Sequence, residues 1–299
     1  MGNIDLVALH IFKTVAEEGG ITKAAAKLHR VQSNVTTRVK QLEAKLGTNL
    51  FLRRRRGLLL SPEGRLLLAY ADQLLRLSSE AENLVRAGAP RGTLRIGTME
   101  STAASRLPPL LSRYHSAYPE VRLELVTGTS GALVAKVLDY EVEAAFVAEP
   151  TIDKSLESQP AFSEDLVLIA PRTFPAIRTG KDIGRSTVIA FGAGCAYRRR
   201  LEDWLRRVKA APERVMEFGS YHTIVACVAG GAGIAVVPRS VIGAVLADKQ
   251  VAIYPLPADI ARAKTRLVWR RGHRSSALDA MRKELARVAP AIHRRRAPE

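Results

Sequence analysis

Cysteine is almost absent from this 299-residue sequence, which contains Cys195, Cys227 and no other. Two cysteines exclude a disulfide-rich scaffold and a cysteine-rich zinc module. The six histidines are scattered, and no two have metal-ligand spacing on one expected helix, so we expect no metal site and no cofactor. No serine or cysteine nucleophile has a motif partner nearby, so the sequence does not indicate an enzyme.

Long apolar runs and an export signal are also missing. The densest apolar stretch, Ile224 to Pro238, is interrupted by small residues and falls short of the roughly 18 apolar positions that a membrane span needs. The segment Met1 to Ala16 lacks a basic start, an apolar core and a small-residue cleavage site. We therefore expect a soluble, cytoplasmic protein with no membrane partner.

Acidic residues are scarce relative to basic ones. The chain has 46 Lys and Arg against 29 Asp and Glu, a formal net charge of +17. The first sixty residues are the most densely basic part, with 11 basic and four acidic side chains. This balance favours a polyanionic partner. With 47% apolar and 25% charged residues, the chain should fold, and its length suggests about two domains.

Three short amphipathic helices are expected near the N-terminus. Apolar residues recur every three or four positions in residues 4–18, and Gly19-Gly20 ends that helix. Thr22 can cap a second helix, and a third runs from Gln32 to Leu46 before Gly47. A tight turn joins the second helix to the third, which is typical of a helix-turn-helix.

A hairpin and a long helix are expected next. Leu50 to Leu52 and Leu58 to Leu60 flank the run Arg53 to Arg56, which predicts a two-stranded wing with its charges at the tip. Ser61-Pro62-Glu63 begins a helix of about 25 residues, whose heptad-like apolar stripe favours a coiled-coil dimer. Gly88 to Gly92 is the clearest linker in the chain.

Beyond the linker, strand-like and helical segments alternate, which predicts an α/β domain with mostly parallel strands. The expected strands are Thr93–Gly97, Arg122–Val126, Ala144–Ala148, Leu166–Ala170, Thr187–Ala190, Ile234–Val237 and Thr265–Arg270. The expected helices are 103–117, 131–139, 197–208, 221–229 and 276–289. The segment beyond the linker is longer than one five-stranded sheet needs, so we expect two similar lobes with a cleft between them.

Seven short motifs occur in the order and spacing of a known family. They are Phe12-Lys-Thr-Val-Ala16, Ala24-Ala-Ala-Lys-Leu28, Gln32-Ser-Asn-Val35, Gln41-Leu-Glu43, Leu46-Gly47, Leu50-Phe-Leu-Arg53 and Ser61-Pro-Glu-Gly64. The stretch from Leu9 to Gly64 thereby resembles the winged helix-turn-helix of LysR-type bacterial transcription regulators. The resemblance implies an all-α winged helix-turn-helix followed by an α/β effector domain with two lobes, similar to periplasmic binding proteins.

The resemblance also implies an organisation of the whole chain. Residues 1–60 would form the DNA-binding domain, residues 61–88 a dimerisation linker helix, and residues 89–299 the effector-binding domain. Within that domain, lobe I would comprise about 91–161 and 267–293, and lobe II about 162–266.

The N-terminal part of the third expected helix presents polar side chains where a recognition helix reaches base edges in the major groove. These are Gln32, Ser33, Thr36, Thr37 and Arg38. A merely solvated polar face is the alternative, but adjacent arginines in the wing suit phosphates. By resemblance, Gln32, Ser33, Thr36 and Thr37 face the groove, while Arg53 and Arg54 approach phosphate or the minor groove. Many relatives have proline and arginine where this chain has Ser33 and Thr37, so base preference does not carry over.

Candidate effector-binding residues lie where expected strands run into helices. They are Thr98, Ser101, Thr102, Thr129, Gly194, Cys195, Tyr197, His222 and Thr223. Free N–H groups at helix N-termini favour an anion, so a small anionic metabolite between the lobes is expected. Ordinary capped turns are the alternative, but the family places its effector near the matching segments.

Three further patterns have simpler explanations. Gly230 to Gly233 follows a helix and precedes a strand, the reverse of a phosphate-binding loop, so we interpret it as a helix end. Some relatives sense peroxide through a cysteine pair, but here we expect an unpaired pocket thiol at Cys195 and a core thiol at Cys227. The basic run His293 to Arg296 fits a solvated tail that could add nonspecific DNA affinity.

We therefore predict a sequence-specific DNA-binding transcription regulator controlled by a small molecule. Its expected partners are double-stranded promoter DNA with an inverted repeat, the effector, a second copy in a dimer or tetramer, and RNA polymerase. The alternatives are an architectural DNA-binding protein without ligand, a cysteine redox-switched regulator, and a solute-binding protein, which the basic head and missing export signal disfavour.

Overall fold

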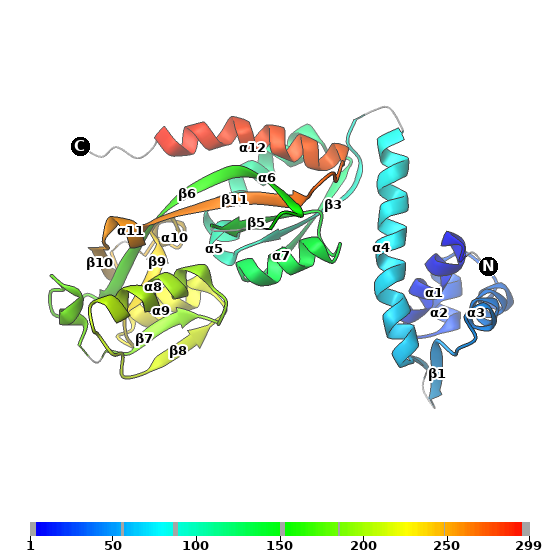
Figure 1. The fold of residues 1–299 in the computed structure, drawn as a ribbon, viewed down its shortest axis with the longest axis horizontal. Helices are drawn as coiled ribbons and strands as arrows, with labels where there is room; N and C mark the ends of the chain where they lie inside the picture. The colour runs from blue at the N-terminus through cyan, green and yellow to red at the C-terminus, as the bar shows by residue number, and fades with distance from the viewer. Residues whose placement is uncertain are drawn as a thin grey trace. The chain divides into compact units, whose positions relative to one another are not determined.

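A computed structural model of the chain divides into two compact units, Met1–Ala87 and Gly88–Glu299. It describes residues 4–54, 57–85, 89–149, 153–184, 186–247 and 249–294. Figure 1 shows the helices and strands of each unit.

The first unit begins with the three expected helices. They are α1 (Leu6–Glu18), α2 (Ile21–Lys27) and α3 (Gln32–Leu46). Asp5 caps α1 by accepting a hydrogen bond from the Ala8 amide at 2.7 Å, and Gly47 ends α3 with a φ of 67°. The inner faces are mainly apolar, and Phe12, Val15 and Val35 are buried. Spacing alone therefore predicted the bounds of α3 correctly.

The expected cap of α2 is wrong. Gly20 is the N-cap residue of α2, and it makes no side-chain cap bond. The Thr22 hydroxyl lies one residue inside the helix and donates to Oε1 of Gln32 at 3.2 Å. Thr22 thus contacts the start of α3 instead of capping its own helix.

The expected wing is confirmed as an antiparallel pair of β1 (Phe51–Arg54) and β2 (Gly57–Leu60). The Leu58 amide donates to the carbonyl of Gly19 at 3.1 Å, which ties the hairpin to the turn between α1 and α2. Arg55 and Arg56, which were expected at the tip, lie outside the described residues, as do the side chains of Arg53 and Arg54.

The long helix α4 (Pro62–Val85) starts as expected. The Ser61 hydroxyl accepts a hydrogen bond from the Gly64 amide at 2.8 Å, and Pro62 occupies the first turn, where its missing N–H costs nothing. One face of α4 packs against the core of this unit through Leu67, Leu68, Ala71 and Leu75.

Gly64 should not tolerate even alanine. A Cβ atom at Gly64 would lie 2.1 Å from the carbonyl oxygen of Leu50, and a backbone atom cannot move aside without shifting β1. We expect Gly64→Ala to lower the free energy of unfolding of this unit by about 1–3 kcal/mol, measured by thermal or urea denaturation followed by circular dichroism. Gly20→Ala is the matched control, because its Cβ would meet nothing within 4 Å; equal losses for both variants would contradict the argument.

The second unit contains a seven-stranded sheet with the order β10-β6-β11-β5-β3-β4, and β9 pairs with β6 beside this path. The strands are β3 (Gly92–Thr98), β4 (Val121–Thr127), β5 (Ala144–Ala148), β6 (Leu156–Pro171), β9 (Ala235–Pro238), β10 (Val251–Pro255) and β11 (Arg262–Arg270). A separate parallel pair comprises β7 (Val188–Phe191) and β8 (Val215–Phe218). The helices are α5 (Glu100–Ser105), α6 (Leu107–Ala117), α7 (Ser130–Leu138), α8 (Ala196–Arg207), α9 (Tyr221–Ala229), α10 (Arg239–Ala244), α11 (Ala258–Ala261) and α12 (Ser276–Arg294), with a 3-10 turn at Gly180–Ile183.

The expectation of mostly parallel strands is wrong. β3 is parallel to β4 and β5, but β11 is antiparallel to both β5 and β6, and β9 and β10 are antiparallel to β6. β6 is also 16 residues long instead of the expected five. Its first half has three consecutive polar residues, Glu157 to Gln159, followed by Pro160, which hides a strand from a search for apolar runs.

β6 contributes to two hydrophobic cores, which is the basis of the two-lobed fold. Phe162 belongs to a core with Leu110 of α6 and Met281 of α12. Leu168, further along β6, belongs to a core with Val228 of α9. The second half of β6 therefore pairs with different strands and packs against different helices from the first half.

The strand β5 is buried on both faces. Ala144 and Phe146 pack in the core with α6 and α12, whereas Ala145 and Val147 pack in the core that contains Leu133 of α7. Successive side chains of a strand point to opposite faces, so a strand covered by helices on both sides is apolar throughout. Figure 1 shows α12 and α7 on opposite faces of this sheet.

The helix expected over residues 103–117 starts earlier and is broken into α5 and α6. Pro108 and Pro109 have no N–H to donate to the preceding turn, so the chain restarts a helix at Leu107 with proline in its first turn. Four further elements were not predicted, namely β8, β10, α10 and α11, which are short segments of four to six residues.

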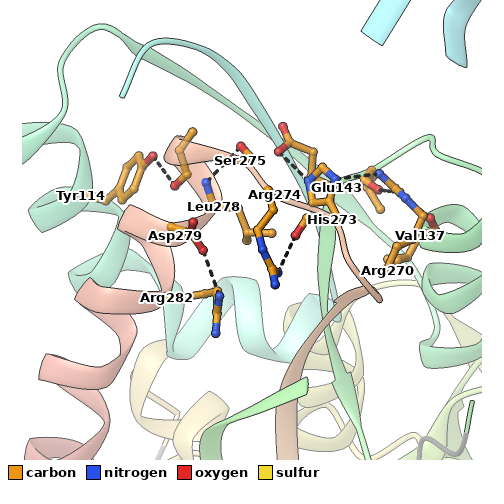
Figure 2. Close-up of polar contacts among 12 residues, drawn as sticks. Tyr114, Val137, Glu143, Arg270, His273, Arg274, Ser275, Leu278, Asp279 and Arg282 are labelled. Atoms are coloured by element: carbon orange, nitrogen blue, oxygen red, sulfur yellow. Dashed lines mark hydrogen bonds and ion pairs between the residues drawn. The ribbon is translucent and has the colours of Figure 1, made fainter. Parts of the chain in front are cut away.

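A buried polar cluster ties the start of β5 and the end of α7 to the end of β11 (Figure 2). The Arg270 guanidinium donates to the carbonyls of Val137 and Val142 at 2.6 and 3.1 Å. It also lies 3.4 Å from Nδ1 of His273, whose Nε2 is 3.3 Å from the Glu143 carboxylate. Because a guanidinium only donates, Nδ1 must accept and Nε2 carries the proton that bonds Glu143.

Candidate functional site

The N-terminal face of α3 is exposed, as expected. Gln32, Ser33, Thr37 and Arg38 are exposed, and Thr36 is half-buried. Val35, Val39 and Leu42 form the buried opposite side of the same helix. Exposed amides, hydroxyls and a guanidinium on one rigid helix can form hydrogen bonds with base edges or phosphates.

Two of these side chains already have partners within the protein. The Thr36 hydroxyl donates to the Gln32 carbonyl at 2.8 Å, and the Gln32 side-chain oxygen accepts from Thr22. Such a contact leaves the Gln32 amide NH2 group free to donate while holding its direction. The geometry therefore preorganises Gln32 more than Ser33 or Thr37.

A cavity of about 270 Å³ in the second unit brings several of the expected effector-binding residues together. It is lined by Met99, Glu100, Ser101, Gly128, Thr129, Ser130, Phe191, Cys195, Ala196, Tyr197 and Tyr221. These residues come from the starts of α5, α7, α8 and α9 and from the end of β7. The lining thus joins segments that are up to 122 positions apart in sequence, Met99 to Tyr221.

Four of the expected residues line the cavity, namely Ser101, Thr129, Cys195 and Tyr197. Gly194 is next to the lining residue Cys195. Its φ of 86° favours glycine, and a Cβ atom at this position would lie 3.2 Å from the Thr129 hydroxyl.

The other expected residues do not line the cavity. Thr98 and Thr102 are fully buried, and the Thr98 hydroxyl donates to the Met99 carbonyl at 3.1 Å. His222 and Thr223 are exposed, and their neighbour Tyr221 contributes to the lining instead. Adjacent residues of a helix point about 100° apart. A residue that lines the cavity therefore does not imply that its neighbour in the sequence lines it too.

Glu100 is the most important lining residue that sequence reasoning missed. Its Oε1 accepts hydrogen bonds from the Tyr221 amide at 3.2 Å and the Ser220 hydroxyl at 3.3 Å. Burial raises the pKa of this carboxyl, although the bonds to Tyr221 and Ser220 and the nearby His222 act in the opposite direction. The available signal was an acidic residue directly before Ser101 in the first expected strand-to-helix turn.

The buried carboxylate of Glu164 lies near the start of α6. Nε and Nη2 of Arg106 donate to the two oxygens of Glu164 at 2.7 and 3.0 Å. The Ser240 hydroxyl, on α10, donates to Glu164 at 2.8 Å and lies 3.1 Å from the Ser105 hydroxyl. This network joins the break between α5 and α6 to the middle of β6 and to α10.

Both cysteines are free and half-buried. Cys195 lines the cavity, with its Sγ 3.7 Å from the Tyr221 hydroxyl, and Cys227 packs at the edge of a core. Within the described ranges, no group of three or more His, Cys, Asp or Glu side chains is placed to hold a metal ion. Among the helices that the structure describes, none combines the length and hydropathy needed to cross a membrane.

Comparisons with known proteins cover nearly the whole chain. Residues 6–65 match the family model described as a bacterial regulatory helix-turn-helix protein of the lysR family, and residues 87–290 match the LysR substrate binding domain. The uncharacterized HTH-type transcriptional regulator YusT of Bacillus subtilis (strain 168) is 42% identical over 264 residues, which cover 88% of each chain. The HTH-type transcriptional regulator GltR of the same organism is 41% identical over 241 residues, 80% of this chain and 81% of GltR.

Solved structures share the fold at lower sequence identity. A full-length OxyR variant from Pseudomonas aeruginosa superposes with a TM-score of 0.70 at 22% identity and covers 95% of both chains. Full-length CbnR in complex with its target DNA gives a TM-score of 0.70 at 22% identity, covering 96% of this chain and all of CbnR.

Proposed function

Since the chain belongs to the LysR-type family of bacterial transcriptional regulators, we propose that it reads an inverted-repeat promoter site and is switched by a small molecule bound in its second unit. The chain is a DNA-binding regulator with a substrate-binding domain and not an enzyme, as the resemblance implied. The observation that carries the proposal is the exposed polar start of α3 above a wholly apolar inner face.

In this proposal, α3 enters the major groove with its N-terminal end first. Gln32, Ser33, Thr36, Thr37 and Arg38 contact base edges or adjacent phosphates, and Arg53 and Arg54 at the end of β1 contact phosphate or the minor groove. CbnR binds its target DNA with the same fold, which supports this arrangement.

Two copies would be joined through the exposed apolar side of α4, and dimers would pair into tetramers. Residues 61–88 form the proposed dimerisation segment, between a DNA-binding domain of 1–60 and an effector domain of 89–299. A ligand that binds one quaternary state better than another would shift the spacing of the DNA-binding heads and their contact with RNA polymerase. Because the proposed target is promoter DNA, we expect the protein to act in the cytoplasm.

The cavity at the starts of α7, α8 and α9 is the proposed effector site, between lobe I (about 91–161 and 267–293) and lobe II (about 162–266). Ser101, Thr129 and Tyr197 supply hydroxyl groups, and Phe191 and Tyr221 supply a stacked aromatic wall with ring centroids 5.2 Å apart. A purely anionic effector, as expected from the helix N-termini, would sit beside the Glu100 carboxylate. We therefore replace that expectation with a molecule that also carries a hydrogen-bond donor.

Selection of genomic fragments with the purified protein at near-physiological salt, followed by footprinting, tests the DNA-binding proposal. We expect a protected inverted repeat, and Gln32→Ala should weaken binding to it by about 5- to 150-fold, the cost of a lost base contact. Gln41→Ala is the matched control, because Gln41 is also exposed on α3 but lies half a turn around the helix. No enrichment over random fragments, or equal losses for both variants, would refute specific recognition through this face.

A further inference from the structure

One oxygen of the Glu100 carboxylate is buried without a partner at the cavity wall. Oε1 is occupied by the Tyr221 amide and the Ser220 hydroxyl, whereas Oε2 is buried and has no hydrogen-bond partner among the described residues. The Tyr197 hydroxyl, on a side chain only 2% exposed, lies instead beside the side chains of Ser101 and Thr265. Buried polar atoms are normally paired, so Oε2 of Glu100 indicates a bound molecule, and a carboxylate oxygen requires a donor.

The same cavity offers donors for a negatively charged group. The nine-residue helix α7 and the twelve-residue helix α8 both start in its lining, at Ser130 and Ala196. Neither first turn contains an acidic residue, and the α8 N-cap residue, Cys195, accepts no side-chain cap bond. Unsatisfied amides at a helix N-terminus favour a carboxylate or another anion.

The charges of the lining decide between ligand classes. Glu100 is its single carboxylate, and the lining contains no lysine or arginine. A dicarboxylate would therefore place a negative charge beside Glu100 with no basic side chain to offset it, and a simple amine would leave the amides of α8 unpaired. A molecule with a cationic donor at one end and a carboxylate at the other satisfies both sides.

We propose that the effector is a small zwitterion of the α-amino acid class, whose ammonium pairs with Glu100 and whose carboxylate binds the amides at the start of α8. This inference rests on the effector site proposed above. The side chain of the zwitterion lies against Met99 and the stacked rings of Phe191 and Tyr221.

The test measures binding of the twenty standard L-amino acids to the full-length protein by thermal shift and calorimetry. We expect at least one to bind, and its decarboxylated amine and its des-amino carboxylic acid each to bind at least tenfold more weakly. Glu100→Gln should weaken the amino acid at least tenfold, whereas Glu120→Gln, the same change at an exposed turn residue, should leave its affinity unchanged. If Glu100→Gln does not fold, Glu100→Asp, which keeps the charge but shortens its reach, should weaken binding as well.

Two results would overturn the proposal. In the first, no amino acid binds; in the second, the des-amino carboxylic acid binds the wild-type protein as tightly as the amino acid does. Footprinting of the ligand-free protein distinguishes failure of this inference from failure of the proposed function. If the inverted-repeat footprint is retained, the proposed DNA-binding function stands and only the zwitterionic effector is rejected.

Discussion

Replacing Glu164 with alanine should lower the free energy of unfolding of the second unit by about 1–3 kcal/mol, because it leaves a half-buried arginine and a hydroxyl without the carboxylate to which they donate. Glu164 is only 2% exposed, accepts a two-pronged pair from Arg106 and also accepts from Ser240. Removal of the carboxylate leaves the Arg106 guanidinium, on a side chain 18% exposed, and the half-buried Ser240 hydroxyl without their shared acceptor.

Urea denaturation followed by tryptophan fluorescence measures this loss directly. Both tryptophans of the chain, Trp204 and Trp269, are buried in the second unit, so the signal reports on that unit alone. Glu124→Ala is the control: the Glu124 side chain is 27% exposed in its pair with Arg95, and such a surface pair contributes about 1 kcal/mol or less. Comparable losses for the two variants would show that burial of the Arg106 pair has no energetic consequence.

The double variant Leu74→Glu, Leu77→Glu should dissociate the protein to monomers and weaken its binding to an inverted repeat by about 10²- to 10⁴-fold. Leu66, Tyr70, Leu74 and Leu77 are 44–63% exposed along α4 and recur every three or four residues, the spacing of a coiled-coil seam. When two heads are joined, binding of the second half-site is intramolecular, and that advantage disappears in a monomer.

Analytical ultracentrifugation measures the dissociation, and fluorescence anisotropy with one half-site and with the full repeat measures the loss of affinity. Half-site affinity should not change, because the exposed leucines are not among the residues of α4 that pack in the core of the first unit. Ser79→Glu, at another exposed position of the helix, should remain dimeric. A double variant that stays dimeric would rule out this face as the interface.

α4 illustrates how far a sequence pattern reaches. The heptad-like stripe correctly predicted one long helix, and Ser61 and Pro62 predicted its start. The pattern does not distinguish Leu67 and Leu75, which pack against the rest of their own unit, from Leu74 and Leu77, which remain exposed. All four are leucines at helical spacing, and only the position of α1 separates the two faces.

The effector site shows the same limit more strongly. Strand-to-helix turns predicted Ser101, Thr129, Cys195 and Tyr197 as lining residues, because a turn and a helix start are local features with known residue preferences. Glu100 was missed because its significance depends on Tyr221, which lies 121 positions later in the chain. His222 and Thr223 were chosen from the correct segment but face solvent.

The sequence by itself therefore determined the family, the three helices of the DNA-binding head and the segments that approach the effector site. These depend on interactions between residues a few positions apart, such as a cap, a left-handed glycine or a helical repeat. Only the tertiary structure decided that β6 serves two cores, that Glu164 is buried beside Arg106, and that a carboxylate faces the cavity. Each of these depends on contacts between segments that are far apart in sequence, and no local propensity encodes them.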